Sequence, residues 1–247
     1  MANENRLTLV VMPFAGSGAS VFNEWNQLNN NIDVIAIQLP GREKRFIETP
    51  YKDVKSAVDG ELQQVLDAIN LNQPIAIFGH SLGAVLAYEM AHLLVKQTGL
   101  DVRSLYVSGS PGPRTQRTKR ATGLNDDDFV KCVEEFAGYS HVALKDPNMR
   151  ELLLPLLRAD VEMHENYKPS RDIPLNIPIY TLRGDQDTLV SAEMADQWKD
   201  ATTAPKHCIE FSGGHMYLVE QAAEMLQEIE KSFFKTPSNI NTVEYLL

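Results

Sequence analysis

The sequence of 247 residues contains few cysteines and no long apolar run. Its two cysteines, Cys132 and Cys208, cannot build a disulfide framework, and neither belongs to a CxxC pair, so we expect a protein of the reducing cytoplasm. No apolar run approaches the roughly 18 residues of a transmembrane helix. The apolar stretch at 7–16 has no basic leader before it, which favours a buried strand over a signal peptide.

An excess of basic residues is also lacking. The 23 Lys and Arg side chains face 33 Asp and Glu side chains, which gives a net charge of −10. Nucleic-acid backbones and anionic membranes attract proteins rich in Lys and Arg, so we expect neither as a partner. Apolar residues at 43% and charged residues at 23% match ordinary globular usage and argue against a disordered chain. The length suits a single α/β domain over 1–247.

Short apolar segments alternate with longer amphipathic ones. The predicted strands are Leu7–Met12, Asp33–Gln38, Pro74–Phe78, Ser104–Ser108, Ile177–Arg183 and His207–Phe211. The predicted helices are Ala19–Leu28, Lys52–Ile69, Leu82–Lys96, Ala192–Lys199 and Tyr217–Phe234. Several strands are almost continuous in Val, Ile and Leu, as strands buried on both faces are. The pattern predicts the α/β class, with a mostly parallel central sheet and helices on both faces.

The interval 112–172 contains no predicted strand. It holds two apolar helical patterns, formed by Phe129, Val133 and Phe136 and by Leu153, Leu156 and Leu157. An insertion of this kind is either structural padding or a lid over the carboxyl ends of the strands, where open α/β sheets bind ligands. We favour the lid, because the insertion follows a strand expected to border such a site.

The pentapeptide Gly-His-Ser-Leu-Gly at 79–83 lies between a predicted strand and a predicted helix. This context is typical of the G-x-S-x-G nucleophile elbow, in which a tight turn presents the serine at a helix N-terminus. The alternative is a Gly-Ser turn without chemistry. We interpret Ser81 as a nucleophile.

A serine nucleophile needs a base and an acid, which in this type of fold follow it at the ends of later strands. His215 follows two glycines after the last strand and is the predicted base. Asp187 and Asp185 both follow the preceding strand; we prefer Asp187 as the acid and regard Asp185 as a turn former. The segment 108–112 holds no carboxylate, which excludes an acid after the earlier strand.

The tetrahedral intermediate of acyl transfer needs two N–H donors. The backbone N–H of Leu82 is the first, and the second is expected from Phe14 or Ala15 in the glycine-containing loop 13–18; spacing leaves this choice open. The remaining histidines have no metal-ligand spacing, so no metal or other cofactor is predicted.

Several separated segments resemble one known family. They are Met-Pro-Phe-Ala-Gly at 12–16, Gln-Leu-Pro-Gly-Arg-Glu at 38–43, Phe-Gly-His-Ser-Leu-Gly at 78–83, Leu-Leu-Arg-Ala-Asp at 156–160 with Tyr167, Gly-Asp-Gln-Asp at 184–187 and Gly-Gly-His-Met-Tyr at 213–217. In this order they are similar to the type II thioesterases of nonribosomal peptide and polyketide synthesis, within the α/β-hydrolases. Family members commonly have Gly-Gly-His-Phe-Phe at the last segment, so Met216 and Tyr217 depart mildly.

The resemblance implies a serine thioesterase that removes misprimed or stalled acyl groups from the phosphopantetheine arm of carrier proteins, beneath a mobile helical lid. Small acyl thioesters are further expected substrates. The alternatives are a medium-chain acyl-carrier-protein hydrolase, a general carboxylesterase and a noncatalytic binding protein on the same scaffold.

Carrier proteins are generally acidic, so docking on this acidic chain would need local basic patches. The candidates are Arg42, Lys44 and Arg45 in one cluster and Arg114, Arg117, Lys119 and Arg120 in another. Either cluster is equally consistent with a solvated loop.

Overall fold

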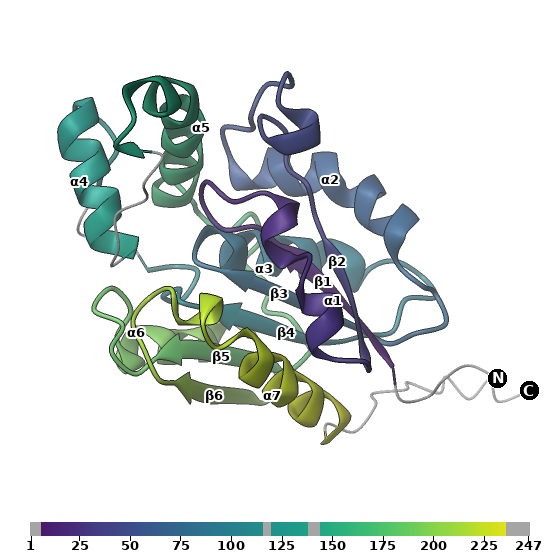
Figure 1. Cartoon of the computed structure of the whole chain (residues 1–247). Helices are drawn as coiled ribbons and strands as arrows, with labels where there is room; N and C mark the ends of the chain where they lie inside the picture. Colours follow the sequence, from purple (N-terminus) through teal and green to yellow (C-terminus); the bar gives the residue numbers. More distant parts are fainter. Residues whose placement is uncertain (1–5, 116–119, 138–143, 236–247) are drawn as a thin grey trace, which may run out of the picture.

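The computed structural model describes residues 6–115, 120–137 and 144–235. Six strands pair in parallel to form one sheet in the order β2-β1-β3-β4-β5-β6 (Figure 1). The strands are β1 (Leu7–Met12), β2 (Ile32–Ala36), β3 (Ile75–His80), β4 (Val102–Ser108), β5 (Ile179–Gly184) and β6 (Lys206–Phe211). All six predicted strands are confirmed, with ends that differ from the predicted ones by at most two residues.

Helices cover the sheet and form the insertion. They are α1 (Trp25–Leu28), α2 (Val54–Ala68), α3 (Leu82–Leu94), α4 (Asp126–Ala137), α5 (Pro147–Glu165), α6 (Ala192–Asp196) and α7 (Ala222–Lys235). Of the helices in the described residues, none is both long enough and apolar enough to span a membrane.

Three predicted helices differ from the observed ones because 3-10 turns interrupt them. The turns are η1 (Ala19–Phe22) before α1, η4 (Gln197–Ala201) after α6 and η5 (Tyr217–Val219) before α7. Apolar residues three or four apart are compatible with both i→i+3 and i→i+4 hydrogen bonding. The sequence pattern therefore places these segments but does not separate the two kinds of helix.

Alternate side chains of the central strands enter two apolar cores. From β1, Val10 packs in the core beneath α2 and α3, whereas Val11 packs on the opposite face with residues of α1 and α7. Figure 1 shows these helix pairs on the two sides of the sheet. Because both faces are covered, the central strands β1 and β3 are buried along their whole length and largely apolar, whereas the edge strand β6 is mostly exposed or half-buried.

The chain order creates a binding crevice at the carboxyl ends of β1 and β3. The chain leaves β1 to form β2 on one side and then returns to form β3 on the other. The loops after β1 and β3 thus diverge at a topological switch point, where open α/β sheets bind ligands.

The insertion contributes α4 and α5, which pack against each other beside this crevice (Figure 1). It has a small core of its own that includes Phe129 and Leu154. Asp146 caps α5 by accepting hydrogen bonds from the N–H groups of Asn148 and Met149. Whether the insertion moves as a lid stays a prediction, and the side chain of Phe136 lies outside the described part of the chain.

Candidate active site

Ser81 lies at the turn between β3 and α3, with φ of 54° and ψ of −113°. Such a positive φ is strained for a residue with a side chain. The turn is possible because its flanking residues are glycines: a Cβ on Gly79 would lie 1.8 Å from the Gly83 carbonyl oxygen, and one on Gly83 would lie 2.4 Å from that of Met12. The Ser81 N–H donates to the Ser108 carbonyl oxygen at 2.8 Å, which ties the elbow to β4.

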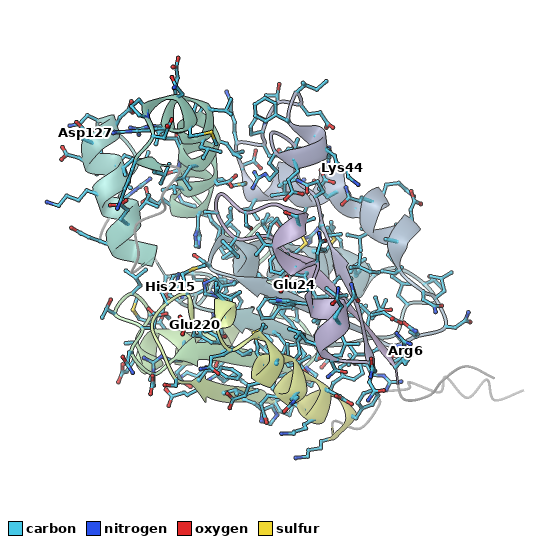
Figure 2. The ribbon with its side chains drawn as sticks, viewed as in Figure 1. Arg6, Glu24, Lys44, Asp127, His215 and Glu220 are labelled. Carbon is cyan, nitrogen blue, oxygen red and sulfur yellow. The ribbon has the colours of Figure 1, made fainter. Side chains whose placement is uncertain are left out.

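Asp187 and His215 meet where the loops after β5 and β6 approach each other. The His215 Nδ1 lies 2.8 Å from Asp187 Oδ2, and both residues are buried. The other carboxylate oxygen, Oδ1, accepts hydrogen bonds from the N–H groups of Leu189 and Val190. Figure 2 shows His215 at the edge of the sheet that faces the insertion.

Asp185 has a different place. It is exposed, and its Oδ1 accepts a hydrogen bond from the Gly213 N–H at 2.9 Å. It therefore braces the glycine turn that precedes His215, while only Asp187 of the two aspartates contacts the His215 ring.

The surroundings of Asp187 favour its ionised form. Burial raises the pKa of a carboxyl, but the hydrogen bond and charge of the His215 ring and the N–H groups of Leu189 and Val190 outweigh it. The pKa of Asp187 consequently lies below its usual value. A carboxylate that stays charged at neutral pH can orient a histidine and stabilise its protonated form.

Ser81 and His215 line one pocket of about 90 Å³. Its walls also include Phe14 and Ala15 from the loop after β1, and Val133 and Leu157 among other residues of the insertion. Within the described residues, no hydrogen bond joins the Ser81 hydroxyl to the His215 ring. Such bonds are often long in unliganded sites and tighten when substrate binds.

The predicted oxyanion donors border the same pocket. Leu82 is the first residue of α3, and Phe14 and Ala15 line the wall beside Ser81. The next two N–H groups of the loop are occupied, because Gly16 donates to Asp160 and Ser17 donates to the Phe14 carbonyl. Among the described residues, no acceptor is bonded to the N–H of Phe14 or Ala15.

Two histidines assigned to packing or surface positions lie next to this site. His80 is fully buried, and its ring centroid is 4.8 Å from that of His215. Its Nδ1 is 2.8 Å from the Ser108 hydroxyl, which is in turn 2.7 Å from the Tyr217 hydroxyl. Burial, and then the charge of His215, holds the pKa of His80 well below its usual value, so a neutral ring backs the predicted base.

The second of these is His164 of α5, which lines the pocket wall. Neither histidine has a local sequence signal beyond its helix or strand position. One residue could have indicated the hydrogen-bonded chain from His80 through Ser108 to Tyr217. In the segment 213–217, Tyr217 replaces the Phe common in the family and so adds a hydroxyl group.

The interpretation of 42–45 as a basic docking cluster is wrong for Arg42, and for the half-buried Arg45 it stays a prediction. Arg42 is buried and bonded to Asp160, and Arg45 pairs with Glu48 and Glu61. Only Lys44 is exposed, and Figure 2 shows it on the loop before α2.

In the other cluster, Arg114 pairs with Asp172 and Arg120 with Glu165, while residues 117 and 119 lie outside the described part of the chain. Over residues 6–115, 120–137 and 144–235, no group of three or more His, Cys, Asp or Glu side chains is arranged to hold a metal ion.

The parallel sheet, the strained elbow after β3 and the helices on both faces are the fold of the α/β-hydrolases, as predicted. Residues 7–233 match the family model described as the Thioesterase domain. The chain therefore belongs to the thioesterase family, a family of hydrolases.

Individual relatives place it more closely. The gramicidin S biosynthesis protein GrsT of Aneurinibacillus migulanus is 32% identical over 224 residues, which cover 90% of this chain and 87% of GrsT. Among solved structures, YbtT, a type II thioesterase from the yersiniabactin biosynthetic pathway, matches with a TM-score of 0.84 and 27% identity over 94% of this chain and 95% of YbtT. The type II thioesterase BorB of the borrelidin cluster matches with a TM-score of 0.82 and 31% identity over 94% of both chains. The predicted resemblance to type II thioesterases is confirmed.

Proposed function

We propose that the protein hydrolyses acyl thioesters carried on the phosphopantetheine arm of carrier proteins, and so clears misprimed or stalled synthase modules. The proposal rests on one observation: His215, which is hydrogen-bonded to the buried Asp187, lines the same pocket as Ser81 of the elbow. Relatives named for peptide and polyketide biosynthesis support the substrate class. We place this activity in the cytoplasm, where we expect the synthase.

In the proposed mechanism, Ser81 Oγ attacks the thioester carbonyl carbon while His215 Nε2 accepts its proton. Asp187 orients the ring through Nδ1 and stabilises the imidazolium. The N–H of Leu82 and that of Phe14 or Ala15 stabilise the oxyanion. The tetrahedral intermediate collapses, the C–S bond breaks, and the thiol of the arm leaves with the proton from His215. Water, activated by the same base, then hydrolyses the acyl-enzyme, so no metal or organic cofactor takes part.

An apolar pocket beside Ser81 fits the acyl group. It has a volume of about 370 Å³ and shares Phe14, Ala15, Val133, Leu157 and Met216 with the pocket that holds Ser81 and His215. The predicted apolar face of α5 enters it through Leu153, Leu156 and Leu157. In contrast, Phe129 is buried within the insertion's own core. We propose that the insertion at 112–172 acts as the lid of this acyl chamber.

Enlarging Leu153 is expected to discriminate between acyl lengths. Leu153→Trp should lower kcat/KM for an octanoyl carrier protein at least about tenfold more than for an acetyl carrier protein, because the chamber loses space needed only by the longer chain. The neighbouring Leu152 is 50% exposed, so Leu152→Trp is a matched control. It should change neither kcat/KM for either carrier protein nor the ratio between the two values. An equal loss for both acyl groups with a large fall in Tm would mean that Leu153 is ordinary core, where overpacking costs about 1–3 kcal/mol.

The substrate class is tested by comparing three substrates with one acyl group: the holo-carrier protein thioester, the pantetheine thioester and a p-nitrophenyl ester. We expect kcat/KM to be highest for the carrier protein. Preference for the oxygen ester would favour a general carboxylesterase, and activity confined to medium-chain carriers would favour a chain-length-setting hydrolase. If a fluorophosphonate probe fails to label Ser81, the chain is a noncatalytic binding protein.

A further inference from the structure

A buried carboxylate of the insertion is bonded to the loop that borders the reacting serine. Asp160, on α5, is fully buried. Its Oδ2 accepts a hydrogen bond from the Gly16 N–H at 2.8 Å. Gly16 directly follows Phe14 and Ala15, the two candidates for the second oxyanion donor.

Arg42 completes this connection from the loop after β2. Its two terminal nitrogens bond the two oxygens of Asp160, each at 2.8 Å, and Nη1 also donates to the Ser17 carbonyl at 2.9 Å. Both charges are almost completely buried, with 5% and 1% of the two side chains exposed. The pair therefore holds one N–H and one C=O of consecutive loop residues: Asp160 accepts from the Gly16 N–H, and Arg42 donates to the Ser17 carbonyl.

The loop's backbone groups divide into occupied and available ones. Besides the Gly16 N–H, the Ser17 N–H is occupied, since it donates to the Phe14 carbonyl at 3.0 Å. Gly16 has φ of +76°, and a Cβ there would lie 3.1 Å from Leu157 Cδ1, so the loop is pressed against α5. The N–H groups next to this fixed point, those of Phe14 and Ala15, border the pocket that holds Ser81.

Stability alone is a weak explanation for this arrangement. Replacing a buried ion pair by well-packed apolar residues is often neutral or stabilising, because two charges no longer need to be desolvated. Apolar residues, however, could not accept the hydrogen bond that the Gly16 N–H donates to Asp160. Donors of an oxyanion hole act only if they are already oriented toward the position of the developing charge.

We propose that Asp160, held by Arg42, is a positioning residue that fixes the oxyanion loop. Asp160 accepts the hydrogen bond of the Gly16 N–H and so fixes the conformation of the loop. In this conformation the N–H of Phe14 or Ala15 is directed at the reacting carbonyl oxygen. This inference rests on the proposed function, because it assigns a role within that same reaction. It also makes one helix of the insertion part of the geometry of the active site.

The test separates positioning from stability with a charge-free pair. Asp160→Leu alone leaves the buried Arg42 charge without its carboxylate partner and should lower Tm strongly. The double variant Arg42→Met/Asp160→Leu should recover most of that Tm. If Asp160 positions the loop, kcat of the double variant stays about 10- to 100-fold low with little change in KM, since one oxyanion donor is worth about 10²–10³ in kcat. Arg150→Met, which breaks an Arg–Asp pair within the insertion, is the matched control and should keep wild-type kcat.

Inhibitor binding gives a second readout. A trifluoromethyl ketone analogue of the acyl-pantetheine substrate forms an oxyanion with Ser81, whereas a thioether analogue does not. The double variant should lose affinity for the ketone in proportion to kcat/KM and keep its affinity for the thioether. A second double variant, Arg42→Leu/Asp160→Ala, also removes both charges and the acceptor for the Gly16 N–H but adds less bulk, and it is measured in the same way in case the first double variant does not fold.

Wild-type kcat and ketone affinity in a folded double variant, which lacks an acceptor for the Gly16 N–H, would overturn the role of Asp160 and leave the proposed function intact. A wild-type protein that does not hydrolyse carrier thioesters would instead overturn the proposed function itself.

Discussion

Ser81→Ala is expected to lower kcat for carrier-thioester hydrolysis by about 10⁴- to 10⁶-fold, and His215→Ala by a similar factor. The double variant should be no slower than either single one, because a nucleophile without its base and a base without its nucleophile are equally ineffective. The measurement is single-turnover hydrolysis of an acyl carrier protein, followed by mass spectrometry of the arm. Ser81→Ala should also abolish labelling by a fluorophosphonate probe.

The controls for this prediction are a folding measurement and a second histidine. Both variants should keep the wild-type circular dichroism spectrum, since neither side chain fills the main cores. His207→Ala changes an exposed histidine on β6 and should leave kcat unchanged. A Ser81→Ala protein that retained a tenth of the activity would exclude Ser81 as the nucleophile.

Asp187→Asn is expected to cost about 10⁴-fold in kcat. An amide has no charge to stabilise the imidazolium, and its NH₂ group can face His215 Nδ1, which would favour the wrong tautomer. The pKa of Asp187 lies below its usual value, so this carboxyl stays ionised as the pH drops from 7 toward the usual aspartate pKa. Protonation of Asp187 should therefore cause no fall in the wild-type rate over that range.

Asp185→Asn is the matched control for the acid. The amide oxygen of Asn can still accept the Gly213 N–H, so we expect a loss of less than about tenfold, as for one neutral hydrogen bond. Steady-state kinetics on one carrier substrate decide the matter. A severe Asp185→Asn and a mild Asp187→Asn would reverse the assignment of the acid.

The strands and the candidate chemical residues were accessible from the sequence because their signals are local. A nearly continuous apolar segment such as Leu7–Met12 predicts a buried strand whatever packs on it. The Gly-x-Ser-x-Gly pattern between a strand and a helix is contiguous in the sequence, and the space at Gly79 is limited by Gly83 of the same turn. Asp187 and His215 could be proposed because they follow consecutive strands, and parallel strands end at one edge of a sheet.

Features that depend on distant partners were not accessible. Arg42 and Asp160 are 118 positions apart, and nothing in the segment 42–45 shows that its first arginine is buried and paired. A run of basic residues therefore suggested an exposed docking cluster. The contact between His80 and His215 was missed for the same reason, since it joins the end of β3 to the turn after β6.

The strand order also determines when the site can be assembled during translation. After β3 has joined β1, each later strand pairs with the strand made just before it, and β6 at the sheet edge is the last. Protein chains leave the ribosome amino-terminus first. A growing polypeptide thus contains Ser81 and a nearly complete sheet well before His215 emerges. Under the proposed mechanism, thioester hydrolysis cannot begin before His215 has been made, so a chain terminated before this residue that still folds in part should be catalytically silent.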